Sequence, residues 1–151
     1  MPYLLPILKP GAIALISVLI LVPILRSFAL KIRFVDLPES RKVHTRPLAL
    51  LGGVGIYLSF ALAVGLTARF ALPIQGIVIG AGLLMILGLI DDRYGMHPSI
   101  KLLGQAATAA IVIAWGVSVQ FLHTPYLNIP FTLLWVVGIT NAFNLLDNMD
   151  G

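Results

Sequence analysis

The chain has 151 residues, of which 59% are hydrophobic and only 11% are charged, and its formal net charge is +4. Soluble domains carry roughly 25% charged residues, so the composition excludes an ordinary soluble domain and indicates a membrane protein. The absence of cysteine excludes disulfides and thiol chemistry, and the positive charge does not indicate a nucleic-acid partner, because Lys and Arg lie mainly between apolar runs.

Five apolar stretches approach the roughly 20 helical residues that cross a bilayer core about 30 Å thick. In chain order they are residues 4–30, 51–68, 72–90, 102–119 and 129–146. The short links between them favour antiparallel neighbours. The sequence therefore predicts an all-α fold, a polytopic integral membrane helical bundle with about five transmembrane helices, in which residues 1–151 form a single membrane domain.

The basic residues predict the orientation of these helices. If links 31–50 and 91–101 are cytoplasmic, only Lys9 and Arg69 of the ten Lys and Arg lie outside. This bias predicts the N-terminus outside and the C-terminus inside, with an uncleaved first helix, since no good small-x-small cleavage site precedes the basic link. The same topology places all six acidic residues on the cytoplasmic side: Asp36, Glu39, Asp91, Asp92, Asp147 and Asp150.

The first cytoplasmic link is basic and rich in glycine. RKVHTRPLALLGGVGIY (41–57) contains Lys42 and His44 and then three glycines. Basic side chains can bind phosphate, and glycines let the backbone approach a ligand or another helix closely. Alternatively, such a link only sets topology or touches anionic lipid. GGVG does not fit the dinucleotide-binding pattern G-x-G-x-x-G.

The third stretch carries a packing motif and ends in two acids. Gly76 and Gly80 form a G-x-x-x-G, which is typical of a helix-packing face. Asp91 and Asp92 follow the apolar run directly, and adjacent carboxylates repel each other unless a proton or a cation is held nearby. The helix dipole also disfavours acids at a C-terminus. Carboxylate ligands suit Mg²⁺ or Mn²⁺, although a solvated helix end remains the alternative.

The fifth stretch ends in a polar row. Asn141, Asn144 and Asp147 are spaced by three, so they share one face of a helix, and Asp150 extends the row if the helix or a turn continues. An amide inside a bilayer needs a hydrogen-bond partner. The asparagines could therefore join helices, and the aspartates could cap a solvated end. Together with the basic link and the acid pair, however, this row favours an enzyme that handles a phosphate or diphosphate with a divalent metal and a lipid co-substrate.

Three segments carry a family resemblance: KVHTRPLALLGG (42–53), IDDRYGMHPSIKLLGQ (90–105) and NAFNLLDNMDG (141–151). In order and spacing the chain resembles the polyprenyl-phosphate N-acetylhexosamine-1-phosphate transferases of glycosyl transferase family 4. Those membrane enzymes move a sugar 1-phosphate from a UDP-sugar to undecaprenyl phosphate and release UMP. The K-x-H-x-x-P form of the first segment is similar to the branch that uses UDP-N-acetylglucosamine.

The resemblance implies a role for each matching residue. Asp91 and Asp92 match the paired aspartates that bind Mg²⁺, or Mn²⁺ in its place, and that deprotonate or position the lipid phosphate. Asp147 matches a further position of the metal site. The implied substrate-binding residues are Lys42, His44, Lys101, Asn144, Asp147 and Asp150. Gln105 completes the K-x-x-x-Q that begins at Lys101.

The resemblance also implies a setting and shows departures. It implies a multi-pass protein of the bacterial plasma membrane with a cytoplasmic active site, which serves cell-envelope polysaccharide synthesis and has no nucleic-acid partner; a homodimer is one open option. Ala49 and Leu50 replace a proline and a basic residue, and Asn148 replaces a glycine. Family members are considerably longer, so we expect an N-terminal fragment of a larger transferase that is inactive alone.

Two other classes stay open at this stage. A secondary transporter could use intramembrane Asp and Asn for ion coupling, but its polar residues should lie near the midplane of the bilayer. A non-catalytic membrane subunit would need no metal. An intramembrane aspartyl protease fits poorly, because its two aspartates should face each other from separate helices.

Overall fold

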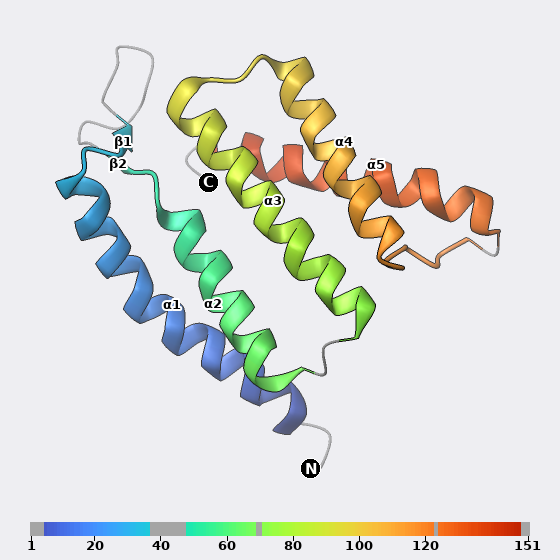
Figure 1. Ribbon diagram of the computed structural model, residues 1–151, viewed down its shortest axis with the longest axis horizontal. Helices are drawn as coiled ribbons and strands as arrows, with labels where there is room; N and C mark the ends of the chain where they lie inside the picture. The colour runs from blue at the N-terminus through green and yellow to red at the C-terminus, as the bar shows by residue number, and fades with distance from the viewer. Residues whose placement is uncertain (1–4, 37–47, 69–70, 123, 149–151) are drawn as a thin grey trace. The chain divides into compact units, whose positions relative to one another are not determined.

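The computed structural model describes residues 5–36, 48–68, 71–122 and 124–148, and it is almost entirely helical (Figure 1). The helices are α1 (Leu5–Lys31), α2 (Gly52–Thr67), α3 (Leu72–Tyr94), α4 (Pro98–Ala114) and α5 (Pro125–Asn148). The β structure of the described residues is one short antiparallel pair, β1 (Val35–Asp36) with β2 (Leu48–Ala49). The prediction of an all-α fold is confirmed.

Within the described residues, three helices are long and apolar enough to cross a membrane. The spans are Leu8–Lys31, Leu72–Tyr94 and Tyr126–Leu146. Many of their large apolar side chains are exposed, for example Leu19 at 66%, as expected where lipid is the solvent. The protein is therefore a membrane protein. Helices α2 and α4 are apolar but have only 16 and 17 residues, about 25 Å at 1.5 Å per residue, so the crossing of all five helices stays a prediction.

Helix α3 continues past its predicted end at residue 90 and includes the acid pair. It ends at Tyr94 because Gly95 has φ +66, a left-handed conformation that favours glycine. The Gly95 amide donates to the Asp91 carbonyl at 2.8 Å. The change from apolar to charged residues marks the edge of the apolar span, whereas the glycine marks the end of the helix. Asp91 and Asp92 therefore lie in the last turn of α3.

The prediction of a fourth helix at residues 102–119 is wrong at both ends. Helix α4 begins at Pro98, which needs no amide partner at a first helical position, and the His97 ring accepts from the Ser99 amide at 3.4 Å. At the other end Gly116 has φ +85 and stops the helix after Ala114. Lys101, predicted to lie in a link, is therefore the fourth residue of α4.

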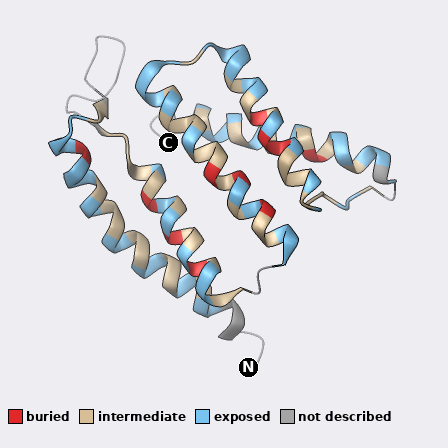
Figure 2. Cartoon of the chain, in the orientation of Figure 1, coloured by how far each residue is buried: buried red, intermediate tan, exposed pale blue. Residues whose placement is uncertain are grey.

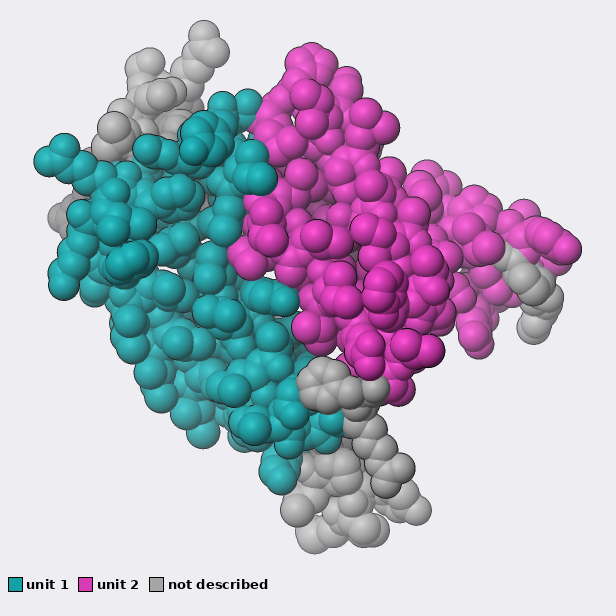
Figure 3. All heavy atoms as spheres, viewed as in Figure 1, with its two compact units in different colours: residues 1–70, 88–95 teal, residues 71–87, 96–151 magenta. Residues whose placement is uncertain are grey.

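The described chain divides into two compact units (Figure 3). The first unit takes its residues from 1–70 and 88–95, and the second takes its residues from 71–87 and 96–151. The last turns of α3, with the acid pair, belong to the first unit. The prediction of a single membrane domain stays a prediction.

In the first unit, α1 and α2 pack as an antiparallel helical hairpin (Figure 1). The buried residues of α2 are Gly55, Ser59 and Ala63, which recur every four positions and form one stripe (Figure 2). A Cβ atom on Gly55 would lie 2.8 Å from Val22 Cγ2, so the missing side chain permits the close approach of the helices. Of the two roles that the sequence left open for glycine here, the structure shows helix packing at Gly55.

In the second unit, the first part of α3 packs on α4 through small residues. A Cβ atom on Gly76 would overlap Trp115 Cβ, and one on Gly80 would overlap Val112 Cγ2. The G-x-x-x-G is thus a packing face, as predicted. Helix α4 also packs on α5. The side chains that this packing buries include Ala109, at 0% exposure, and the polar residues Gln105 and Thr108.

Candidate functional site

The acid pair lies in the last turn of α3, where Asp91 is partly buried and Asp92 is exposed. Successive residues of a helix are about 100° apart around its axis, so the two carboxylates leave α3 in different directions. This difference in direction accounts for their difference in burial.

Three charged residues near the link between α3 and α4 are unfavourably placed with respect to the helix dipoles. Asp91 and Asp92 lie near the C-terminus of α3, which carries partial negative charge. Lys101 lies near the N-terminus of α4, which carries partial positive charge. Arg93, in the last turn of α3, is by contrast favourably placed. The helix dipoles therefore do not account for the two aspartates or for Lys101.

In the first unit, the structure brings the acid-pair turn to the base of the basic link. The Arg93 guanidinium carbon lies 5.6 Å from the centroid of the Phe34 ring, a cation–π contact. Phe34 is held by backbone bonds, since its amide donates to the Ala29 carbonyl at 2.8 Å and its carbonyl accepts from Leu50 at 3.3 Å. Strands β1 and β2 pair beyond it and close the base of link 37–47.

Lys42 and His44, which the sequence predicts to bind phosphate, belong to that link and lie outside the described residues. Phe34 and Arg93 were not predicted from the sequence to be site residues. Phe34 is an aromatic residue directly before a strand, and Arg93 is a basic residue directly after the acid pair. Neither residue type indicates by itself which partner it contacts.

In the second unit, the structure pairs two side-chain amides between α4 and α5. Asn141 Nδ2 donates to Gln105 Oε1 at 2.7 Å and to the Val137 carbonyl at 2.8 Å, and Gln105 Nε2 donates to Asn141 Oδ1 at 3.5 Å. Gln105 is only 1% exposed. The hypothesis that Asn141 joins helices is confirmed for this residue.

The polar row predicted on the fifth helix lies on α5 as far as the structure describes it. Asn141, Asn144 and Asp147 all precede the end of α5 at Asn148, so their spacing of three places them along one face. Asn144 is partly buried. The side chain of Asp147 and all of Asp150 lie outside the described residues.

The donor chemistry of the described site fits a small divalent cation. Among the side chains that the structure describes, no group of three or more His, Asp or Glu gathers in one place. Mg²⁺, however, is commonly held by one or two protein carboxylates, and waters and substrate phosphates supply its other ligands. Asp91 and Asp92 meet that requirement.

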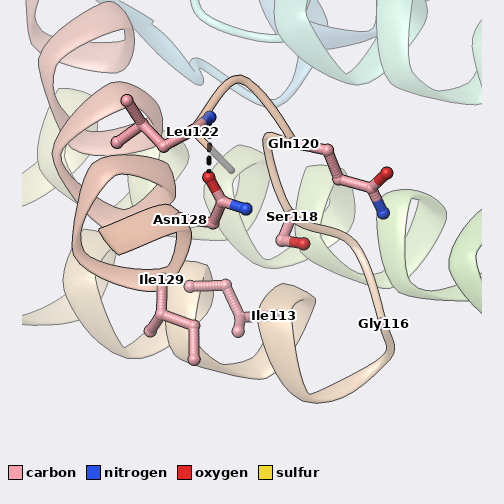
Figure 4. A pocket seen from close by; sticks show the side chains of 7 residues that line it. All are labelled: Ile113, Gly116, Ser118, Gln120, Leu122, Asn128 and Ile129. Atoms are coloured by element: carbon pink, nitrogen blue, oxygen red, sulfur yellow. Dashed lines mark hydrogen bonds between the residues drawn. The ribbon is translucent and has the colours of Figure 1, made fainter. Parts of the chain in front are cut away.

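A separate pocket of about 490 Å³ lies at the other end of α4, between the loop that follows it and the start of α5 (Figure 4). The Asn128 side chain accepts a hydrogen bond from the Leu122 backbone amide at 3.0 Å. The Gln120 side chain points away from Asn128 (Figure 4). None of the described residues that line this pocket is charged. It is therefore poorly suited to phosphate, and it lies about 20 Å along the helix axis from Lys101.

Comparison with known proteins shows which family the chain belongs to. Residues 74–151 match the family model described as Glycosyl transferase family 4, which is about half of the chain. The chain belongs to glycosyl transferase family 4. The matched region begins in α3 and includes the acid pair, Lys101 and the polar row of α5. The family resemblance inferred from the sequence motifs is confirmed.

Several named relatives of this family 4 chain are similar over most of its length. A probable undecaprenyl-phosphate N-acetylglucosaminyl 1-phosphate transferase of Bacillus subtilis is 34% identical over 149 residues, which cover 92% of this chain and 42% of the relative. An undecaprenyl-phosphate alpha-N-acetylglucosaminyl 1-phosphate transferase of Thermotoga maritima is 34% identical, with coverage of 87% and 42%.

A decaprenyl-phosphate N-acetylglucosaminephosphotransferase of Mycolicibacterium smegmatis is 32% identical, with coverage of 83% of this chain and 36% of the relative. The family 4 chain thus spans well under half the length of these relatives. No solved structure matches it significantly.

Proposed function

We propose that this protein transfers N-acetylhexosamine 1-phosphate, with N-acetylglucosamine as the favoured sugar, from a UDP-sugar to undecaprenyl phosphate and releases UMP. The relatives named above carry out transfers of N-acetylglucosamine 1-phosphate to a polyprenyl phosphate, according to their names. The UDP donor, the bacterial plasma membrane and a role in the cell envelope are parts of the same proposal.

One structural observation supports the proposal most directly. In the first unit, the turn that carries Asp91 and Asp92 contacts the base of the basic link through Arg93 and Phe34. A carboxylate pair beside the base of a cationic segment suits a phosphate ester that needs both a metal and cationic contacts. The end of a long apolar helix suits a lipid phosphate, because the polyprenyl chain stays in the bilayer while its phosphate reaches the boundary.

The proposed reaction is a displacement at phosphorus. An oxygen of the lipid phosphate attacks the β-phosphorus of the UDP-sugar and forms a new phosphorus–oxygen bond. The bond from that phosphorus to the bridging oxygen breaks, and UMP leaves with the bridging oxygen. Asp91 or Asp92 holds or removes the proton of the lipid phosphate, and Lys42, His44 and Lys101 bind phosphate oxygens. Asn144, Asp147 and Asp150 contact the nucleotide.

Asp91, Asp92 and Asp147 would hold the divalent metal, Mg²⁺ or Mn²⁺. When bound, the metal offsets the negative charge of the diphosphate and of the leaving UMP. A cation would also offset the repulsion between the two adjacent carboxylates. We place this site on the cytoplasmic face, where the basic residues of the chain are concentrated.

UMP release by the full-length protein tests the proposal. Membranes that carry it are supplied with UDP-N-acetylglucosamine, undecaprenyl phosphate and Mg²⁺, and a parallel sample receives EDTA. We expect UMP release only with the metal. Asp91→Asn and Asp92→Asn should each lower kcat by about 100-fold or more, since each removes a charge from the reacting centre.

Asp36→Asn is the matched control, because it removes a carboxylate predicted to lie on the same membrane face that has no assigned role in the reaction. It should change kcat by no more than about twofold. Full activity of both Asp91→Asn and Asp92→Asn would contradict the proposed roles. Absence of UMP release from every UDP-N-acetylhexosamine would contradict the proposed function.

A further inference from the structure

We propose that the Gln105–Asn141 amide pair is a positioning device that fixes the register of α4 against α5 and thereby fixes the positions of Lys101 and Asn144 relative to each other. The register is an inference from this structure alone, whereas its effect on catalysis rests on the proposed function. Gln105 and Asn141 act through their neighbours and are positioning residues.

The pair satisfies what a register-setting contact requires. Asn141 is fixed to its own helix by the 2.8 Å bond to the Val137 carbonyl, and it reaches across to Gln105 at 2.7 Å. Gln105 is almost completely buried, so an unpaired amide there loses its partner without gaining water. A slip of one residue would rotate either side chain by about 100° and break the pair. Two further hydrogen bonds constrain the helix pair near its other end, where Thr132 accepts from the Val119 amide at 2.9 Å and Asn128 accepts from the Leu122 amide at 3.0 Å. The amide pair is the direct side-chain bond between α4 and α5 nearest to Lys101 and Asn144 among the described residues.

The crossing of α4 and α5 carries this register toward the candidate site. Lys101 precedes Gln105 by four residues, and Asn144 follows Asn141 by three. The two helices cross obliquely and run in broadly opposite directions (Figure 1), so both steps lead away from the amide pair on the same side of the crossing. The displacements are about 6 Å and about 4.5 Å along the two axes, so Lys101 and Asn144 lie at similar distances from the amide pair. In the second unit, these are the two residues with described side chains that the proposed function assigns to the substrate.

The first experiment measures kinetics in the full-length protein. The variants are Gln105→Leu, Asn141→Leu, the double Leu variant and the swap Gln105→Asn with Asn141→Gln, which retains both amides and their combined length. Each single Leu variant should lower kcat/KM for the UDP-sugar by about 3- to 20-fold, in line with the strength of hydrogen bonds between membrane helices. The double variant should be no worse than the worse single variant, and the swap should recover most of the loss.

These variants separate positioning from direct contact. If Gln105 itself touched the substrate, the swap would not restore kcat/KM and the two single effects would multiply in the double variant. That result would overturn the positioning role. A general loss of folded protein is detected separately as loss of the monodisperse peak in gel filtration, and it should be absent in the double Leu variant, which leaves no unpaired amide.

The second experiment reads the register without using activity. Cysteines replace Lys101 and Asn144 in the full-length protein. Residues 1–151 contain no other cysteine, and any cysteine elsewhere in the full-length protein is first replaced by serine. A short bismaleimide is then added to the protein in membranes. Rapid cross-linking is expected, and it should slow by about threefold or more when Gln105→Leu or Asn141→Leu is added.

Cross-linking that neither Leu substitution changes would overturn the inference. Cross-linking that slows as expected, together with no UMP release by the full-length protein that retains Lys101 and Asn144, would support the register and refute the proposed function. The two failures are therefore distinguishable.

Discussion

Individual glycines decide how closely the helices of each unit approach. Gly55 lies against Val22 of α1, and Gly76 lies against Trp115, which directly follows α4; in each case a methyl group would meet an atom of the neighbouring segment. Other glycines have no such neighbour among the described residues, as at Gly138 of α5. The same residue type therefore has opposite consequences at different positions, and a pair of alanine substitutions can separate them.

We predict that Gly76→Ala destabilises the protein and that Gly138→Ala does not. Trp115 Cβ is bonded directly to the backbone, so it cannot avoid a new methyl group by rotating, and overpacking of this kind costs about 1–3 kcal/mol. At Gly138, alanine gains up to about 1 kcal/mol of helix propensity without a clash. The thermal denaturation midpoint in detergent measures both. An unchanged midpoint for Gly76→Ala would show that α3 does not contact α4 at this point.

The ends of the helices carry the candidate site. Helix α3 places Asp91 and Asp92 in its last turn, and Arg93 follows them and contacts Phe34 between α1 and β1. This contact is the described link between the acid pair and the base of the segment that contains Lys42 and His44. The strength of the Arg93–Phe34 contact should therefore affect how well the acid pair and the basic segment bind one substrate together.

We predict that Arg93→Ala and Phe34→Leu each lower kcat/KM for UMP release by about two- to fivefold, which is the equivalent of a cation–π contact at an exposed site. The double variant should lose little more than either single variant, because both remove the same contact. Phe34→Tyr retains an aromatic face and should remain near wild type. Arg26→Ala removes a charge that has no aromatic partner among the described residues and is the control. Independent, multiplying effects of Arg93→Ala and Phe34→Leu would contradict the coupling.

The candidate site can assemble only if the basic link and the acid pair lie on the same side of the membrane. The helix bounds define two links suitable for a test: residues 95–97, before α4, and residues 115–124, after it. The distribution of Lys and Arg predicts that the first is cytoplasmic and the second is outside.

We predict that Ser118→Cys reacts with a membrane-impermeant maleimide in intact cells, whereas Ser99→Cys reacts only after the cells are made permeable. Both changes replace a hydroxyl by a thiol of similar size, so neither should disturb the fold. Residues 1–151 contain no other cysteine, and any cysteine elsewhere in the full-length protein is first replaced by serine. Total labelling after solubilisation measures the reactivity of each thiol and serves as the control. The reverse pattern would place the candidate site outside and would contradict the use of a cytoplasmic UDP-sugar.

The sequence by itself determined the class of the protein and the positions of its helices to within a few residues. A continuous apolar run that crosses a bilayer forms a helix, because its backbone N–H and C=O groups have no water to bind and must form hydrogen bonds with each other. The position of the acid pair at the end of such a run, and the family motifs around it, were equally visible in the sequence. The true ends of α3 and α4 were less visible, since they depend on Gly95, Pro98 and Gly116 rather than on polarity.

Only the tertiary structure decided which residues meet. Gln105 and Asn141 are 36 positions apart, and Phe34 and Arg93 are further apart still. Neither pair is implied by local spacing, because a buried amide or an aromatic face accepts many partners. Packing selects one of them: glycines set the helix separation, the helix separation brings particular side chains within reach, and hydrogen bonds then stabilise that register over its neighbours.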